Sequence, residues 1–207
     1  MYDKPFEIVC NSVDGKRFAF DGAVRGRMRR EMGLEDRRVF LHVGNFNYAK
    51  NQAFLLPVME EILSRDKSAV LLLVGDGGTR PGLEEAAAAR GLAECVRFLG
   101  IRSDVAALLC AADGFLFPSR IEGFPITCLE AQFSGVPCLL SDTIAPEVKI
   151  AQNVRFLKTD DPALWAREAL AITGGERKSA ALFPESASFE AANNKKQLLA
   201  ILREEAL

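Results

Sequence analysis

The chain has 207 residues, which is enough for one large domain with a full hydrophobic core. Its residues are 49% hydrophobic and 26% charged, as in ordinary globular proteins, and its formal net charge of −2 gives no electrostatic case for binding nucleic acid. No apolar run approaches the roughly 18–20 residues of a membrane span, and the first residues do not resemble a signal peptide. We therefore expect a soluble, cytoplasmic protein.

Continuous apolar runs and helical spacing of apolar residues predict strands and helices that alternate along the chain. In chain order, the expected elements are a strand over 7–10, a helix over 25–33, a strand over 39–43, a helix over 51–65, a strand over 70–74, a helix over 82–91, a strand over 95–99, a helix over 105–111, a strand over 113–117, a helix that begins near 125, strands over 137–140 and 154–157, and helices over 162–172 and 187–205. Continuous apolar strands are typical of a sheet covered on both faces. We expect an α/β fold with a Rossmann-like, doubly wound parallel sheet.

Three residues carry local expectations within these elements. Gly33 is a plausible C-cap of the 25–33 helix. Pro57 should kink the 51–65 helix, and Asp104 should be the cap of the 105–111 helix.

Cysteine and histidine usage argues against a metal site. Five cysteines are scattered through the chain without a Cys-x-x-Cys pair, which favours free thiols in a reducing compartment. The single histidine, His42, lies inside an apolar run, and we interpret it as a buried strand residue and not as a catalytic base. No carboxylate pair has metal-ligand spacing, so we expect neither a metal nor a cofactor.

The stretch from Phe117 to Pro137 predicts a strand end, a tight loop and a helix whose first turn is open to a ligand. Gly123 lets the backbone approach a ligand closely, and Pro125 lies where a missing N–H is tolerated. The free N–H groups at about Ile126 and Thr127 point out of the positive end of the helix dipole. These features predict an anion site suited to phosphate.

Two carboxylates frame this anion site, Glu122 in the loop and Glu130 inside the helix. At about 1.5 Å rise per residue, Glu130 lies roughly 6–8 Å along the axis from the helix start, about the distance from a diphosphate to the ribose of the same nucleotide. Glu122 is placed for hydroxyls beyond the diphosphate. The pattern predicts a nucleotide-diphosphate sugar, and the simpler alternative is an amphipathic helix with two solvated glutamates.

The segment Glu122-Gly-Phe-Pro125, with Glu130 and Ser134-Gly-Val-Pro137, closely resembles the sugar-nucleotide motif of retaining GT-B glycosyltransferases of family four. The likeness is strongest to the branch that builds capsular and extracellular polysaccharides. It covers most of this chain but only half of a typical enzyme, because family members also have an N-terminal acceptor domain. We therefore expect that domain to be absent here, whether the chain is cut from a longer enzyme or encoded as a fragment.

The resemblance implies one domain over 1–207 that binds the donor. Residues 1–18 would form the interdomain crossover strand, and the helix over 187–205 would cross back toward the N-terminal domain. Asn11-Ser-Val-Asp14 is similar to the family's segment at that crossing.

The resemblance also implies roles for the loops that follow the expected strands over 39–43, 70–74 and 95–99. Gly44 and Lys50 match the family's phosphate loop, in which Lys50 is the matched cation. Asn45 stands where the family has an arginine, so one phosphate contact loses its charge. Gly75 matches the loop near the base and ribose. Ile101 and Arg102 match residues that meet the nucleobase, although Arg102 could equally be a surface arginine.

In the implied reaction, a sugar passes from a nucleotide diphosphate to an acceptor hydroxyl with retention and without a metal. Lys50 and the helix start at Ile126–Thr127 would stabilise the departing diphosphate, and Glu122 with the backbone of Gly123 and Phe124 would hold the sugar. Glu130 would hold the ribose. UDP is the commonest nucleotide in such enzymes, and the acceptor could be lipid-linked at the inner face of the plasma membrane.

Two alternatives stay open at this point. One is another enzyme of the same architecture, either a sugar-nucleotide epimerase or a phosphorylase, although no lysine in a context for pyridoxal phosphate is found. The other is a non-enzymatic nucleotide-sugar-binding module, or half of a split transferase that works with a partner chain. We expect this half alone to show no transferase activity.

Overall fold

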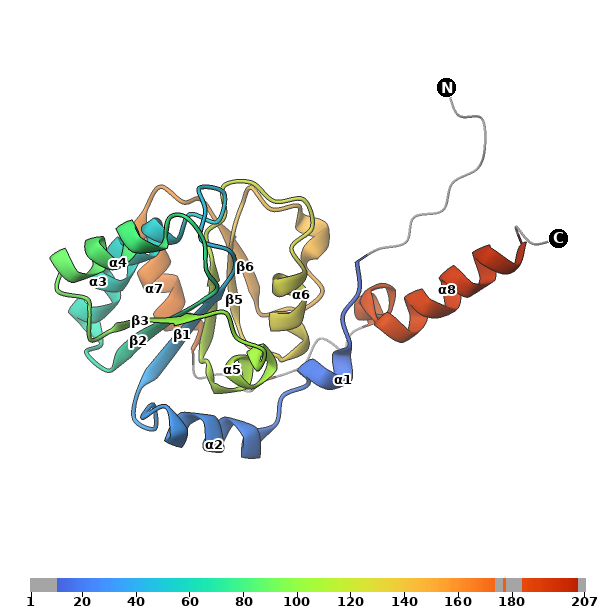
Figure 1. Cartoon of the computed structure of the whole chain (residues 1–207), viewed down its shortest axis with the longest axis horizontal. Coiled ribbons are helices and arrows are strands. Elements are labelled where there is room, and N and C mark those ends of the chain that lie inside the picture. The colour runs from blue at the N-terminus through green and yellow to red at the C-terminus, as the bar shows by residue number, and fades with distance from the viewer. Residues whose placement is uncertain (1–10, 174–176, 178–183, 205–207) are drawn as a thin grey trace, which may run out of the picture.

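A computed structural model describes residues 11–173, 177 and 184–204, and Figure 1 shows its course. Six strands form one parallel sheet in the order β3-β2-β1-β4-β5-β6. The strands are β1 (Arg38–Val43), β2 (Ala69–Val74), β3 (Val96–Gly100), β4 (Gly114–Phe117), β5 (Cys138–Ser141) and β6 (Val154–Leu157). This order is that of a doubly wound sheet and confirms the predicted fold class.

Helices cover both faces of the sheet, as Figure 1 shows. They are α1 (Gly15–Phe18), α2 (Gly22–Glu31), α3 (Leu55–Arg65), α4 (Arg80–Ala89), α5 (Val105–Ala111), α6 (Ile126–Phe133), α7 (Pro162–Ile172) and α8 (Ala191–Glu204), with 3-10 turns η1 (Gln52–Phe54), η2 (Pro146–Val148) and η4 (Pro184–Phe189). One buried cluster includes residues of α3, α4 and α7, and the other includes residues of α1, α2, α5 and α6. The four inner strands β1, β2, β4 and β5 are therefore buried on both sides, which explains their continuous apolar sequence, whereas the edge strands β3 and β6 are only partly buried.

The centre of the sheet is the place where the strand order reverses direction. β1 pairs with β2 along its whole length, from Arg38–Ala69 to Val43–Val74. Its register with β4 comprises Phe40–Gly114 and Leu41–Phe115. β1 and β4 thus lie side by side while their connections continue to different faces of the sheet.

The expectation for Pro57 is wrong, and the expectation for Asp104 is confirmed only in its N-cap position. The 51–65 segment is not one helix kinked at Pro57, because α3 begins at Leu55 after η1 and places Pro57 in its first turn, where no backbone N–H is required. Asp104 stands at the start of α5 but makes no side-chain cap bond. Its carboxylate instead accepts hydrogen bonds from Arg102 at 2.8 and 2.6 Å.

The chain ends also differ in part from expectation. The strand expected over 7–10 lies outside the described residues. Residues 15–18, expected to continue a crossover strand, form the helical turn α1, because the Asp14 side chain accepts from the N–H groups of Lys16 and Arg17. The 187–205 helix begins later, as α8, after the turn η4.

The segment near Val13 lies against the segment just before α8. Val13 forms a parallel bridge with Glu190, and the Phe189 ring stacks on Phe124 with centroids 5.4 Å apart. Figure 1 shows α8 continuing from this contact away from the sheet. No helix among the described residues is long and apolar enough to cross a membrane.

Candidate functional site

The candidate site lies at the carboxyl ends of β1 and β4. Ligands of doubly wound sheets bind in the crevice where the strand order reverses, because the loops there diverge. The loop after β1 carries Lys50, and the loop after β4 carries Glu122. The structure therefore brings together two residues that the sequence placed in separate loops.

The side chains of Lys50 and Glu122 form an ion pair between these two loops. Lys50 Nζ lies 2.6 Å from Glu122 Oε1, and the two side chains are 21% and 9% exposed. The ammonium also lies 5.1 Å from the centre of the Phe117 ring, within reach of a cation–π contact. Because the pair is partly withdrawn from water, its attraction is screened less than that of a surface pair.

Hydrogen bonds between the two loops hold this pair in place. Asn51, whose φ of 55° turns the chain into η1, donates from Nδ2 to the Pro118 carbonyl at 3.1 Å. The Arg120 N–H donates to the Ala49 carbonyl at 2.7 Å, and its guanidinium donates to the Tyr48 carbonyl. Sequence reasoning missed these contacts, although an asparagine directly after Lys50 is a residue that tolerates the left-handed region.

The first turn of α6 lies after the Glu122 loop. Pro125 occupies the N-cap position and makes no side-chain cap bond, while the Cys128 N–H already donates to the Pro125 carbonyl at 3.1 Å. The first two helical N–H groups, those of Ile126 and Thr127, are therefore left without a capping side chain, as the sequence predicts. Such a helix start attracts an anion.

Glu130 lies one turn further along α6 and is half-buried. Burial raises the pKa of its carboxyl, and the nearby Arg17 of α1 opposes that shift. The charges of Glu122, Lys50 and Glu130 all act on the buried thiol of Cys128, whose pKa burial raises well above its usual value. All three predicted polar residues therefore lie within electrostatic range of Cys128, in the first turn of α6.

Two glycines allow the loops after β1 and β2 to approach each other. Gly75 has a φ of +129°, and a Cβ there would lie 2.1 Å from the Gly44 carbonyl oxygen. The Asn45 carbonyl accepts from Gln52 Nε2 at 2.9 Å, while the residue itself is exposed. A Cβ at Gly123 would meet nothing within 4 Å, so packing within the described chain does not demand glycine there.

The side chains of three other predicted site residues make no contact with the Lys50–Glu122 pair that the structure records. Ile101 is 83% exposed after β3. The Arg102 guanidinium is held by Asp104, and this contact favours its interpretation as a surface arginine. The Phe124 ring packs on Phe189, so its side chain supports the chain end while its backbone lies in the Glu122 loop.

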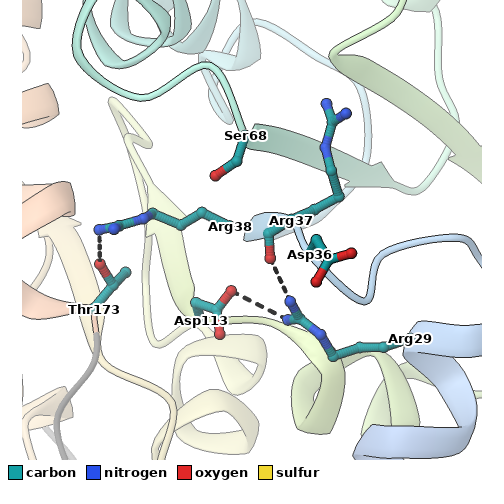
Figure 2. Close-up of a pocket in the computed structure, with 7 residues that line it drawn as sticks. All are labelled: Arg29, Asp36, Arg37, Arg38, Ser68, Asp113 and Thr173. Carbon is teal, nitrogen blue, oxygen red and sulfur yellow. Dashed lines mark hydrogen bonds and ion pairs between the residues drawn. The ribbon is translucent and has the colours of Figure 1, made fainter.

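A polar cavity of about 310 Å³ lies at the opposite end of the sheet, at the amino ends of the strands. Figure 2 shows its lining residues, which are Arg29, Asp36, Arg37, Arg38, Ser68, Asp113 and Thr173. Arg29 pairs with Asp113 at 3.2 Å, and Arg38 donates to the Thr173 hydroxyl at 2.6 Å. Burial raises the pKa of Asp113, but hydrogen bonds from the Val39 N–H and Arg25 outweigh it and lower the pKa overall. Asp113 is paired with Arg25 and Arg29, and Arg38 is paired with Asp66 at 2.7 Å, so we assign the cavity a structural role.

No three His, Cys, Asp or Glu side chains gather closely enough to hold a metal ion within the described ranges. The predicted polar groups that the loops after β1 and β4 and helix α6 bring to this edge of the sheet are an ammonium, two carboxylates and helix N–H groups. This set can bind a ligand that carries both negative charge and hydroxyl groups.

Comparison with known proteins gives a consistent result. Residues 37–174 match the family model for group 1 glycosyl transferases. The chain is 34% identical over 175 residues to the putative glycosyltransferase EpsF of Bacillus subtilis, covering 83% of this chain and 46% of that protein. It is 31% identical to the UDP-Gal:alpha-D-GlcNAc-diphosphoundecaprenol alpha-1,3-galactosyltransferase of Escherichia coli, over 69% of this chain and 38% of that enzyme.

Solved structures show the same fold. The complex of Anabaena HepE with UDP-glucose superposes with a TM-score of 0.81 at 20% identity, covering 96% of this chain and 57% of that one. The C-terminal domain of a group 1 glycosyl transferase from Francisella tularensis has a TM-score of 0.68 at 17% identity, covering 78% of this chain and 87% of that one. The chain thus spans less than half the length of the curated relatives it matches.

Proposed function

This chain belongs to the group 1 glycosyltransferases, and we propose that it is the donor-binding half of a retaining enzyme of polysaccharide or glycolipid biosynthesis. In this proposal, the crevice between β1 and β4 binds a nucleotide-diphosphate sugar. The enzyme transfers the sugar to an acceptor hydroxyl.

The observation that carries the proposal is the Lys50–Glu122 pair beside the open start of α6. A diphosphate needs positive charge, which the Lys50 ammonium and the N–H groups of Ile126 and Thr127 can supply. A sugar needs acceptors for its hydroxyl groups, which Glu122 can supply from the other side of the same crevice. The cation for the diphosphate and the carboxylate for the sugar thus lie within hydrogen-bond distance of each other.

Glu130 is proposed to accept from the ribose hydroxyls. It lies four residues after Ile126 and therefore one helical turn, about 5–6 Å, from the proposed phosphate position. The uncharged Asn45 would contribute at most a neutral hydrogen bond to the diphosphate. Catalysis would then depend on Lys50 and the helix start, which stabilise the negative charge that develops as the diphosphate departs.

UDP is the proposed nucleotide. The support is by analogy: HepE is crystallised with UDP-glucose, and the name of the E. coli relative contains a UDP sugar. That name also contains a diphosphoundecaprenol acceptor, which supports a lipid-linked acceptor for the complete enzyme. A second domain would supply the acceptor site, so we expect no turnover from the 207 residues alone.

Calorimetric titration of the chain with UDP, GDP and ADP, without added metal, tests the proposal. We expect one nucleotide to bind with a Kd of about 10⁻⁵–10⁻³ M, since these 207 residues span less than half the length of the relatives and supply one side of the proposed cleft. Glu130→Ala should weaken this binding by more than about 1 kcal/mol, which is roughly fivefold. Glu85→Ala, at an exposed position on α4, is the matched control and should bind as the original chain does.

Two results would contradict the proposal. If none of the three nucleotides binds at millimolar concentration, the crevice is not a donor site in this chain. If a nucleotide binds but both glutamate variants bind it equally well, the ligand lies somewhere other than along α6.

A further inference from the structure

The only histidine of the chain, His42, lies directly beneath the candidate site. It is fully buried near the end of β1, one position beyond the last register pair that joins β1 to β4, Leu41–Phe115. There its Nδ1 lies 2.9 Å from the Leu116 carbonyl oxygen of β4. A side-chain hydrogen bond therefore joins the two strands at the point where the crevice opens.

The His42 ring also forms part of the surface on which Lys50 rests. It stacks on Phe117 with ring centroids 5.4 Å apart and an interplanar angle of 22°, and the Lys50 ammonium lies over the same Phe117 ring. A Cβ on Gly44 would lie 3.3 Å from His42 Nε2 and 3.4 Å from Cδ and Cε of Lys50. The imidazole edge and the lysine side chain thus border the same small space beside Gly44.

The protonation state of the imidazole follows from these contacts. A carbonyl oxygen can only accept, so Nδ1 carries the proton and Nε2 keeps a lone pair. Nε2 is buried and has no hydrogen-bond partner among the described residues. Burial lowers the pKa of His42 to about 4, against the hydrogen bond with Leu116, and the Lys50 charge lowers it further. The ring is therefore neutral at pH 7 and does not repel the ammonium.

We propose that His42 is a positioning residue for Lys50: its imidazole ties β4 to β1 at the mouth of the crevice and, with Phe117, forms the floor that holds the lysine beside Glu122. This inference rests on the proposed donor site, because it assigns His42 a role in the geometry of that site. His42 itself does not touch the ligand, since it is 0% exposed. It acts through Lys50.

The contact can be tested without any nucleotide. Because the chain has one histidine, its ¹⁵N resonances are unambiguous. We expect the neutral Nδ1–H tautomer at pH 7 and a titration near pH 4. Lys50→Met should raise the pKa of His42, because it removes the neighbouring positive charge, whereas Lys149→Met, at an exposed site, should leave it unchanged. A neutral Nε2–H tautomer, or a pKa that does not respond to Lys50→Met, would overturn the inference.

The functional consequence is tested by nucleotide binding in a double-variant cycle. His42→Phe keeps a ring against Phe117 but loses the bond to Leu116, and we expect it to weaken UDP binding about tenfold. In a Lys50→Met background, the same substitution should cause no further loss, because its effect passes through Lys50. His42→Asn restores a donor near the position of Nδ1 and should recover part of the affinity.

If His42→Phe only lowered the folding stability, a destabilising substitution elsewhere in β1 would weaken UDP binding as well. Val39→Ala, at the far end of β1, controls for it and should leave the affinity unchanged. Equal loss from His42→Phe with and without Lys50, or no loss at all, would show that His42 has no positioning role. If the original chain binds none of UDP, GDP and ADP, the donor-site proposal fails and the functional role of His42 fails with it. The ¹⁵N titration would then still decide whether His42 contacts Lys50.

Discussion

Lys50 and Glu122 are 72 positions apart in the chain, yet Nζ of one lies 2.6 Å from Oε1 of the other. Each residue comes from a loop that follows a central strand, and the two strands are neighbours only in the folded sheet. The proposed phosphate-binding cation and the proposed sugar-binding anion satisfy each other. A donor must therefore rearrange this ion pair or extend it with its own oxygens and hydroxyls.

Lys50→Met should weaken UDP binding at least tenfold. The substitution removes a charge-assisted hydrogen bond, which contributes about 1.5–3 kcal/mol, and keeps a side chain of similar length over the Phe117 ring. Isothermal calorimetry measures the change. Lys149→Met, which removes an exposed lysine, should bind normally. Equal affinities for the original chain and Lys50→Met would exclude Lys50 from the site.

UDP affinity should fall as the pH drops through the pKa of Glu130. Burial raises that pKa, so the carboxyl takes up a proton at a higher pH than an ordinary glutamate does. A protonated carboxyl accepts less well from the ribose hydroxyls, and binding therefore favours the ionised form. Glu130→Gln cannot titrate and should show a flatter pH dependence of the Kd. Parallel curves for the two proteins would rule out a role for Glu130 ionisation.

Folding stability should decrease as the pH falls from 6.5 toward 4, with a contribution from His42. The folded chain keeps the imidazole neutral down to about pH 4, whereas the unfolded chain protonates it near 6.5. Protons thus favour the unfolded state in this window, and the full contribution is about 3 kcal/mol. Urea denaturation at several pH values measures it. His42→Phe lacks the contribution, so its stability curve should be flatter, and an identical slope would refute the assignment.

Gly75→Ala should destabilise the fold by more than about 2 kcal/mol and should abolish nucleotide binding. The added methyl would lie 2.1 Å from the Gly44 carbonyl oxygen, at a φ of +129° that alanine rarely adopts. Relief of the clash must move the loop that carries Lys50. Gly78→Ala, where a Cβ meets nothing within 4 Å, is the matched control and should be tolerated. Thermal unfolding distinguishes them, and two equal melting temperatures would contradict the prediction.

Much of the fold could be predicted from the sequence because its signals are local. A strand covered on both faces is continuously apolar, as in Ala69–Val74, and a strand of this kind is recognisable without its neighbours. The open start of α6 was predictable for the same reason, since Pro125 and the residues after it determine which N–H groups remain free. Both features depend on residues only a few positions apart.

Expectations failed in whole or in part where a side chain had a choice of partners. Asp104 takes the expected N-cap position of α5, but its carboxylate pairs with Arg102, because a charged partner two residues away competes with the helix N–H groups. The expectation for Pro57 failed because it depended on where α3 begins. That boundary is set by the left-handed turn at Asn51 and by the 3-10 turn that follows it.

The alternation of buried strands and helices, the open start of α6, and the candidates Lys50, Glu122 and Glu130 could all be recognised in the amino-acid sequence. The pairing of Lys50 with Glu122 and the position of His42 against Phe117 became visible only in the folded chain, as did the ion pairs that line the polar cavity at the opposite end of the sheet. These contacts depend on the strand order, which places β1 beside β4, and no short-range pattern in either segment encodes which strand will be its neighbour.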